Sequence, residues 1–150
     1  MNEEARQRLE VLVGEWTMEA AAPGGPPWPG DARVSFQWME GAPLLIQRWR
    51  ADHPDAPDGV AVIGCDGARD TYVQLYTDQR DVQRIYSMSL TDGVWKLWRD
   101  GEPFAQRFTG TLSEDGSTIT GRWELAEDGS TWRVDFDLTY RRASSPSAGH

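Results

Sequence analysis

Apolar and polar residues alternate along most of this chain, which predicts a protein built from β-strands. The pattern is clear in Val34, Phe36 and Trp38, which are separated by Ser35 and Gln37. It returns near the C-terminus in a longer alternating set: Trp132, Val134, Phe136, Leu138 and Tyr140. Because successive side chains of a strand point to opposite faces, each such strand has one buried and one solvated face.

The same alternation predicts about ten strands at regular spacing. They cover Glu15–Ala20, Ala32–Glu40, Leu44–Arg50, Gly59–Cys65, Thr71–Tyr76, Val82–Leu90, Val94–Arg99, Phe104–Leu112, Ser117–Leu125 and Thr131–Arg141. Ahead of them, Glu3–Val13 has apolar residues at helical spacing and predicts a short helix that ends at Gly14.

Asp-Gly pairs separate the last five predicted strands and favour tight hairpin turns. They are Asp92-Gly93, Asp100-Gly101, Asp115-Gly116 and Asp128-Gly129. Consecutive hairpins imply an antiparallel meander, and closing a meander into a barrel removes its two unpaired edges. The predicted fold is therefore an all-β, closed antiparallel barrel with a helix at one end. A two-sheet sandwich fits the same strand pattern and is the alternative.

Several short motifs resemble those of lipocalin-like (calycin) barrels. Leu12–Trp16 is similar to their Leu-x-Gly-x-Trp opening, and Ile63–Asp66 followed by Tyr72 resembles a stretch of an uncharacterised bacterial lipocalin-like family. The segments similar to that family's closing hairpins are Phe108–Gly110, Gly121–Glu124 and Trp132–Tyr140. The resemblance implies a barrel of about ten strands with an internal cavity, and no established activity.

Nitrobindins are a more distant group with a similar barrel, and they bind haem through a histidine near the C-terminal end of the barrel. Here the last predicted strand contains no histidine. The two histidines are His53, in a long predicted loop, and His150, in the tail. The axial ligand that the resemblance would require is missing, so we expect no haem and no other cofactor.

The composition of the chain narrows the range of binding partners and cellular locations that we expect. Twenty-four acidic and 15 basic residues give a net charge of -9, which disfavours nucleic acid as a partner. No apolar run is long enough to span a membrane, and Met1–Glu4 is acidic and leads into no apolar segment, so we expect no secretory signal. The single cysteine, Cys65, excludes an internal disulfide. We expect one cytoplasmic domain over residues 1–142 and a disordered tail over residues 143–150.

The candidate binding residues are those that share strand faces with aromatic side chains. They are Phe36, Trp38, Tyr72, Gln74, Tyr76, Arg84, Tyr86, Gln106 and Phe108. If these faces point inward, the barrel holds an apolar pocket with a few polar groups, which is typical of a small-molecule site. An inward Arg84 would pair with an acidic ligand group. An outward Arg84 would pair with an acid on a neighbouring strand instead.

Residues in two predicted loops could each have either a functional or a purely structural role. Trp28, within the Pro- and Gly-rich segment Ala21–Asp31, either closes over a bound ligand or packs on the barrel rim. Asp52, His53, Asp55 and Asp58 could hold a metal, but their spacing matches no known metal motif, so we expect none.

The sequence therefore predicts a binder of a small apolar or amphipathic molecule. One alternative is a small isomerase or cyclase that uses the same cavity for proton transfer, with Arg84, Tyr86 and Tyr72 as the first residues to test. A second alternative is a scaffold that forms a homodimer through an exposed sheet face.

Overall fold

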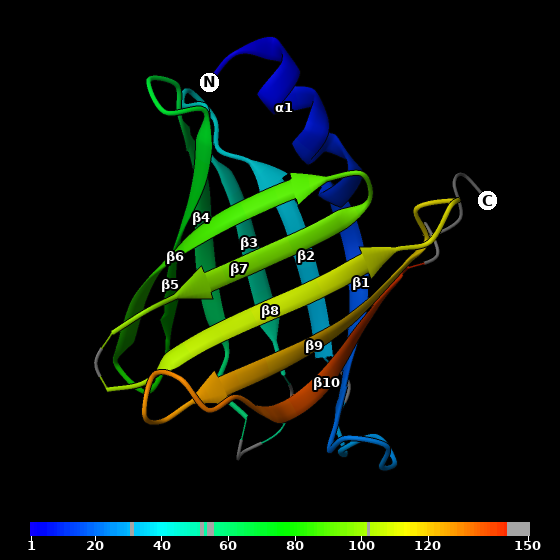
Figure 1. The fold of residues 1–150 in the computed structure, drawn as a ribbon. Helices are drawn as coiled ribbons and strands as arrows, with labels where there is room; N and C mark the ends of the chain where they lie inside the picture. The colour runs from blue at the N-terminus through cyan, green and yellow to red at the C-terminus, as the bar shows by residue number, and fades with distance from the viewer. Residues whose placement is uncertain (31, 52, 54–55, 102, 144–150) are drawn as a thin grey trace, which may run out of the picture.

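The computed structural model describes residues 1–30, 32–51, 53, 56–101 and 103–143. Within them, ten strands form one closed antiparallel barrel in the order β1-β10-β9-β8-β7-β6-β5-β4-β3-β2 (Figure 1). The strands are β1 (Gly14–Ala21), β2 (Ala32–Trp38), β3 (Leu45–Arg50), β4 (Gly59–Asp66), β5 (Thr71–Asp78), β6 (Val82–Thr91), β7 (Val94–Arg99), β8 (Ala105–Leu112), β9 (Thr118–Ala126) and β10 (Arg133–Arg142). The predicted barrel is confirmed, and pairing of β1 with β10 closes it.

The hairpins follow the turn chemistry of the sequence, although they are not all alike. Asp92 and Gly93 both have positive φ angles, 53° and 76°, as the tightest two-residue hairpin turn requires. At Asp115-Gly116 only the glycine has a positive φ. The Asp115 carboxylate instead accepts a hydrogen bond from the backbone N–H of Ser117.

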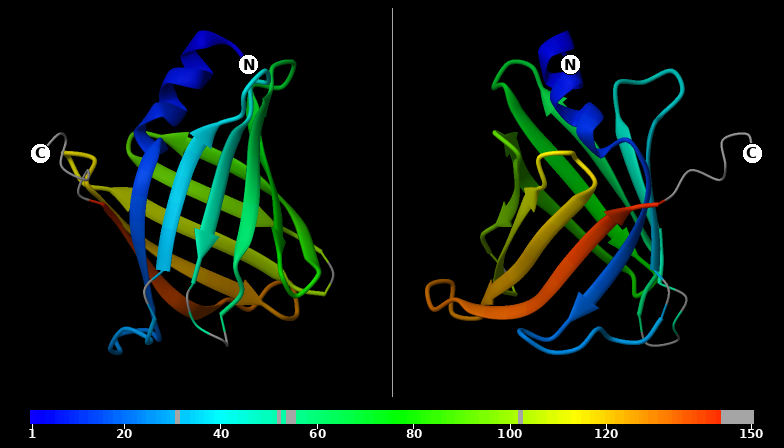
Figure 2. Two further views of the ribbon diagram at one scale, coloured as in Figure 1. Left: turned by 180° about the vertical axis from the view of Figure 1, so that it is seen from behind. Right: turned by 90° about the vertical axis from the view of Figure 1, so that its right-hand side faces the viewer.

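A short helix covers one end of the barrel (Figure 2). Helix α1 spans Glu3–Leu9 and continues as a single 3₁₀ turn, Glu10–Leu12. The side chain of Asn2 caps its first turn by accepting from the N–H of Ala5. Leu9 and Leu12 are fully buried against the barrel interior, so this end is closed. The loops after β1, β3, β5, β7 and β9 lie at the opposite, open end (Figure 2).

The junction between helix and barrel is held by Trp16 and Arg142. Trp16 is 1% exposed, and its indole N–H donates to the carbonyl of Leu12. The guanidinium of Arg142 lies 4.1 Å from the centre of the Trp16 ring and donates to the carbonyls of Val11 and Val13. The first and last strands are thus tied to the end of the helix.

The predicted alternation of β10 changes phase partway along the strand. A bulge lies between Val134 and Phe136, because Phe136 pairs with Trp123 while Val134 pairs with the adjacent Glu124. Phe136 and Leu138 line the interior. Glu124 forms an ion pair with Arg107, whose guanidinium lies over Trp132. The expected shared apolar face therefore holds for Phe136, Leu138 and Tyr140 but is wrong for Trp132 and Val134, which precede the bulge.

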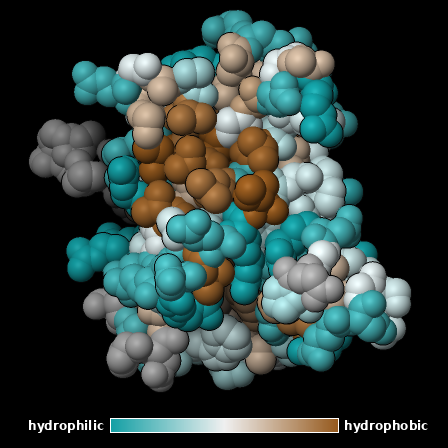
Figure 3. Space-filling model, turned by 90° about the vertical axis from the view of Figure 1, so that its left-hand side faces the viewer, coloured by the Kyte–Doolittle hydropathy of each residue, from teal (hydrophilic) through white to brown (hydrophobic). Residues whose placement is uncertain are grey.

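Apolar side chains also gather on part of the outer surface. Figure 3 views the face formed by β4–β6 and shows a hydrophobic cluster there. Leu75 and Ile85 are directly paired across β5 and β6 and are 46% and 66% exposed. Val73 on β5 and Trp98 on β7 extend the exposed set. None of the described helical segments is long and apolar enough to cross a membrane.

Candidate functional site

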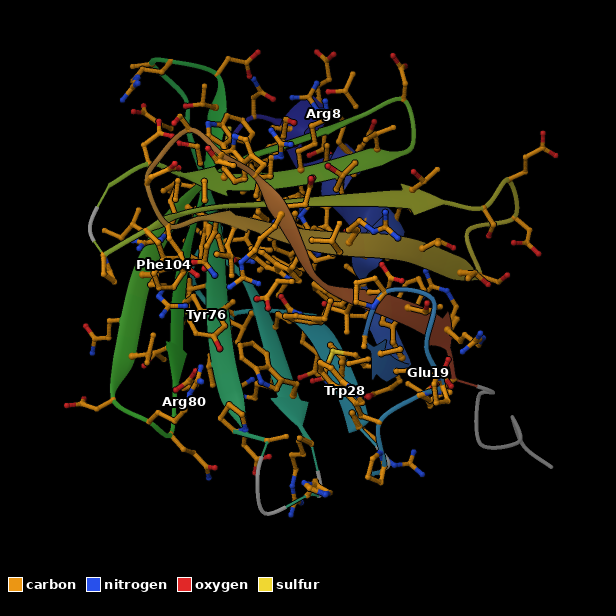
Figure 4. The ribbon with its side chains drawn as sticks, turned by 60° about the horizontal axis from the view of Figure 1, so that its bottom comes forward. Arg8, Glu19, Trp28, Tyr76, Arg80 and Phe104 are labelled. Carbon is orange, nitrogen blue, oxygen red and sulfur yellow. The ribbon has the colours of Figure 1, made fainter. Side chains whose placement is uncertain are left out.

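The open half of the barrel contains a cavity of about 870 Å³. Its volume is within the range of small-molecule sites. The lining residues include Met18, Trp28, Gln47, Trp49, Gln74, Tyr76, Arg80, Arg84, Tyr86, Trp95, Leu97, Phe104, Gln106, Phe108, Trp123, Phe136, Leu138 and Tyr140. Figure 4 looks into the open end, with Tyr76, Arg80 and Phe104 on one side of the mouth and Trp28 across from them.

Six of the nine predicted site residues line this cavity. They are Gln74, Tyr76, Arg84, Tyr86, Gln106 and Phe108. The face assignments that placed polar groups beside aromatic rings are thus correct for these six positions. Whether they bind a ligand stays a prediction.

The other three, Phe36, Trp38 and Tyr72, lie at the closed end and do not line the cavity. Phe36 is fully buried and packs edge-to-face on Trp95. The Trp38 indole donates to the Glu10 carboxylate on the 3₁₀ turn. The Tyr72 hydroxyl donates to the carbonyl of Ala5 in helix α1. All three hold the helix and the barrel core together.

Trp49 and Tyr76 form a stacked pair on one wall of the cavity. Their ring centres lie 5.3 Å apart with the planes inclined by 29°. The Trp49 indole lies over Gly59, where a Cβ atom would collide with the indole ring and lie 2.7 Å from the Thr77 carbonyl. Its N–H donates to the carbonyl of Pro57. Glycine at position 59 therefore sets the position of this wall.

Arginine side chains and a glutamine form a polar cluster near the mouth. Gln106 Oε1 accepts hydrogen bonds from the Tyr86 hydroxyl at 2.8 Å, from Arg99 Nε at 3.2 Å and from Arg84 Nη1 at 3.5 Å. Both guanidinium groups also lie over the Phe104 ring, at 5.2 Å for Arg84 and 5.6 Å for Arg99. Arg84 forms no ion pair within the described residues.

Burial raises the pKa of the Tyr86 hydroxyl, and the nearby Arg84 opposes this shift. Tyr86 therefore remains a neutral hydrogen-bond donor at physiological pH. The outward arrangement of Arg84, with an acid on a neighbouring strand, does not occur among the described residues: Arg84 lines the cavity and contacts Gln106.

A buried carboxylate, which the sequence analysis did not select, organises the rim. The side chain of Asp78 is 0% exposed; it accepts from the Tyr76 hydroxyl at 2.6 Å and pairs with Arg80 Nη2 at 2.7 Å. Burial alone would raise the pKa of Asp78, but the hydrogen bonds from Arg80 and Tyr76 lower it to about 2. This carboxylate is therefore an ion at neutral pH and fixes the Tyr76 ring.

The deep part of the cavity is lined by polar side chains that carry no charge. Gln47 and Gln74 are 5% and 2% exposed, and Tyr140 is 4% exposed. Gln47 Nε2 donates to the Tyr140 hydroxyl at 3.4 Å, and burial raises the pKa of that hydroxyl. The Gln74 amide forms no hydrogen bond with another described residue. Strand parity would have placed Gln47 and Tyr140 inward, since they share faces with Leu45 and Leu138.

Trp28 lies at the rim and combines features of both predicted alternatives. It is 50% exposed, its ring centre lies 5.8 Å from that of Phe136, and it lines the cavity mouth.

For the predicted metal alternative, Asp52 and Asp55 lie outside the described residues. The Asp58 carboxylate accepts from the backbone N–H of Ala51. Residues 144–150 of the predicted tail also lie outside the described part.

The fold and the cavity define a small closed β-barrel with a deep cavity at one end, and solved structures of the same kind exist. The crystal structure of Rv2717c from M. tuberculosis matches with a TM-score of 0.61 and 17% identity, covering 93% of this chain and 98% of that one. The S-type phycobiliprotein lyase CPES from Guillardia theta matches with a TM-score of 0.59 and 11% identity, covering 97% and 94%.

At these identities the likeness establishes the barrel fold alone. No protein-family model matches the chain, and no curated protein matches it. Membership of the uncharacterised bacterial lipocalin-like family therefore stays a prediction.

Proposed function

We propose that the barrel binds a small amphipathic molecule, with its apolar body among the aromatic rings and an acidic group at Arg84. The observation that carries the proposal is the combination of an 870 Å³ cavity with an arginine that forms no ion pair in the described part of the chain. A partly buried guanidinium is stabilised by a carboxylate partner, and the ligand would supply one.

The character of the cavity wall supports an apolar ligand body. Trp49, Trp95, Phe108, Trp123 and Phe136 all line it. Rings of this kind provide a large apolar contact area for a ligand. The shared fold of the phycobiliprotein lyase supports a role for the barrel interior, without indicating which molecule enters.

Binding is favoured over proton transfer because the residues predicted for catalysis do not meet. Arg84 and Tyr86 line the cavity, whereas Tyr72 contacts helix α1 at the closed end. Because the pKa of Tyr86 is raised, its hydroxyl keeps its proton at neutral pH and is not available to accept another.

A fluorescence titration with hexadecanoic acid and hexadecan-1-ol tests the proposal, since Trp49 and Trp95 report on the cavity. We expect saturable binding of both, with the acid binding more tightly. Arg84→Met should weaken binding of the acid about tenfold and leave the alcohol unchanged. Arg48→Met, on the exposed face of β3, is the matched control and should change neither. Absence of saturable binding of both probes would overturn the proposal.

Self-association is a second candidate function, favoured by the exposed apolar residues of β5–β7. Leu75, Ile85 and Trp98 could be covered by a second copy of the chain. Light scattering after size exclusion should give a dimer mass for the parent chain and a monomer mass for Ile85→Lys. Val11→Lys, which is also at an exposed apolar position but on the 3₁₀ turn, should keep the parent mass. A monomeric parent chain would exclude this candidate.

A further inference from the structure

We infer that the ligand carries an uncharged oxygen group, a hydroxyl or a carbonyl, on the part that enters the deep half of the cavity. This inference rests on the proposed binding function and adds a ligand class to it. Two residues carry it: Gln74, which is 2% exposed, lines the cavity and forms no hydrogen bond with another described residue, and Trp95, whose indole N–H is fully buried without an acceptor there.

An unpartnered buried amide is unusual and costly. Buried polar groups in proteins nearly always form hydrogen bonds, because an unsatisfied donor or acceptor loses its hydration without compensation. A leucine at position 74 would fill the same space between Ile63 on β4 and Tyr86 on β6 without that cost. The amide is therefore better explained by a hydrogen bond to a ligand than by packing.

The neighbouring polar groups point to the same conclusion. The Tyr140 hydroxyl accepts from Gln47 Nε2 at 3.4 Å, and its own O–H has no acceptor among the described residues. The indole N–H of Trp95, which is 1% exposed and packs against the Tyr140 ring, also lacks an acceptor there. By contrast, the indoles of Trp16, Trp38 and Trp49 all donate to protein oxygens. Strands β5, β7 and β10 thus each contribute to the cavity lining a donor that lacks an acceptor among the described residues.

The groups around Trp95 and Tyr140 lie away from Arg99, whereas Gln74 is a diagonal neighbour of Arg84 across β5 and β6. Arg99 is the last residue of β7, at the mouth, and Trp95 is the second residue of the same strand. Four residues of extended strand separate them by about 13 Å. Gln47, Trp95 and Tyr140 carry no charge, so a second carboxylate beside them would be desolvated without a counter-ion. A ligand hydroxyl or carbonyl can form hydrogen bonds with these groups without the desolvation cost of a buried charge.

The test compares hexadecanoic acid with hydroxy and oxo hexadecanoic acids that carry the oxygen at successive carbons of the chain. For the parent protein we expect at least one oxygenated acid to bind about five- to tenfold more tightly than hexadecanoic acid, the gain of one well-formed buried hydrogen bond. Gln74→Leu should abolish this preference, so that the oxygenated acid and hexadecanoic acid bind the variant with equal affinity. Gln37→Leu, the same change on the outer face of β2, should keep the preference.

Stability of the ligand-free protein gives a second readout. If Gln74 serves a ligand, Gln74→Leu should unfold at the same or a higher temperature than the parent chain, because the amide forms no hydrogen bond with a described residue that the substitution would break. A lower melting temperature would indicate a structural role and overturn the inference. Equal binding of all oxygenated acids and hexadecanoic acid would also overturn it, while leaving the proposed function intact. If no acid binds at all, the proposed function fails as well.

Discussion

The closed and open ends of the barrel contain the same kinds of residues but differ in how their polar atoms are satisfied. At the closed end, Trp16, Trp38 and Tyr72 each donate to an oxygen of the helical segment. In the cavity, Trp95 and Gln74 have no such partner among the described residues. Aromatic content therefore does not distinguish core from site, and the difference lies in a few cavity groups, since Trp49, Tyr76 and Tyr86 also line the cavity but donate to protein oxygens.

This difference predicts that closed-end residues contribute stability and cavity residues contribute affinity. The following variants test it, from the largest expected effect to the smallest.

Trp16→Ala should lower the free energy of unfolding by about 3–5 kcal/mol, because it leaves a large void beneath the helix and removes the ring on which Arg142 rests. Chemical denaturation followed by circular dichroism measures the change. Trp98→Ala is the control; its side chain is 40% exposed on the outer face, and we expect a cost below about 1 kcal/mol. Equal costs would contradict the assignment of Trp16 to the core.

Asp78 is the exception that sharpens the comparison, because it stabilises the open end. Its folded-state pKa of about 2 lies below the ordinary value, so its contribution is complete above about pH 4 and is lost as the pH falls towards 2. Between pH 5 and pH 2 the parent chain should lose about 2 kcal/mol more stability than Asp78→Asn. If the unfolding free energies of the parent chain and Asp78→Asn changed equally with pH, the Tyr76–Asp78–Arg80 cluster would contribute nothing to stability.

Gly59→Ala should disturb the cavity rather than the core. A Cβ atom at position 59 would collide with the Trp49 indole, so that the ring must move towards the cavity. We expect a loss of about 1–3 kcal/mol in stability together with weaker binding of hexadecanoic acid. Gly67→Ala is the control, because its added Cβ would meet nothing within 4 Å. Unchanged binding by Gly59→Ala would mean that the Trp49 wall does not contact the ligand.

Tyr72→Phe should cost about 1–2 kcal/mol, because it removes the hydrogen bond to the Ala5 carbonyl and the one accepted from Arg8 Nε, with no change in the affinity for hexadecanoic acid. Denaturation and fluorescence titration of the same preparation separate the two effects. A marked loss of affinity would place Tyr72 in the binding site after all.

The sequence predicted the barrel well because alternation and turn chemistry act locally. Val94–Arg99 was predicted with its observed bounds, and the other strands differ by at most a few residues. The phase change at Val134 was not predictable in the same way. A bulge depends on the register between β9 and β10, which only the paired strands determine.

Site prediction was limited for a related reason. Strand parity shows which side chains point inward, but not how far along the barrel axis they lie. Tyr72, Gln74 and Tyr76 share one face of β5, yet the first meets the helix and the other two line the cavity. The Asp78 cluster was missed because a single acid at a strand end carries no motif; its role depends on Tyr76 and Arg80 folding around it.

Native mass spectrometry of the protein with one equivalent of hexadecanoic acid tests the central claim most directly. The account predicts a single adduct of one acid per chain, which is depleted in Arg84→Met and retained in Arg48→Met. An unliganded parent chain, or a distribution of several adducts that Arg84→Met leaves unchanged, would contradict a defined binding site inside the barrel.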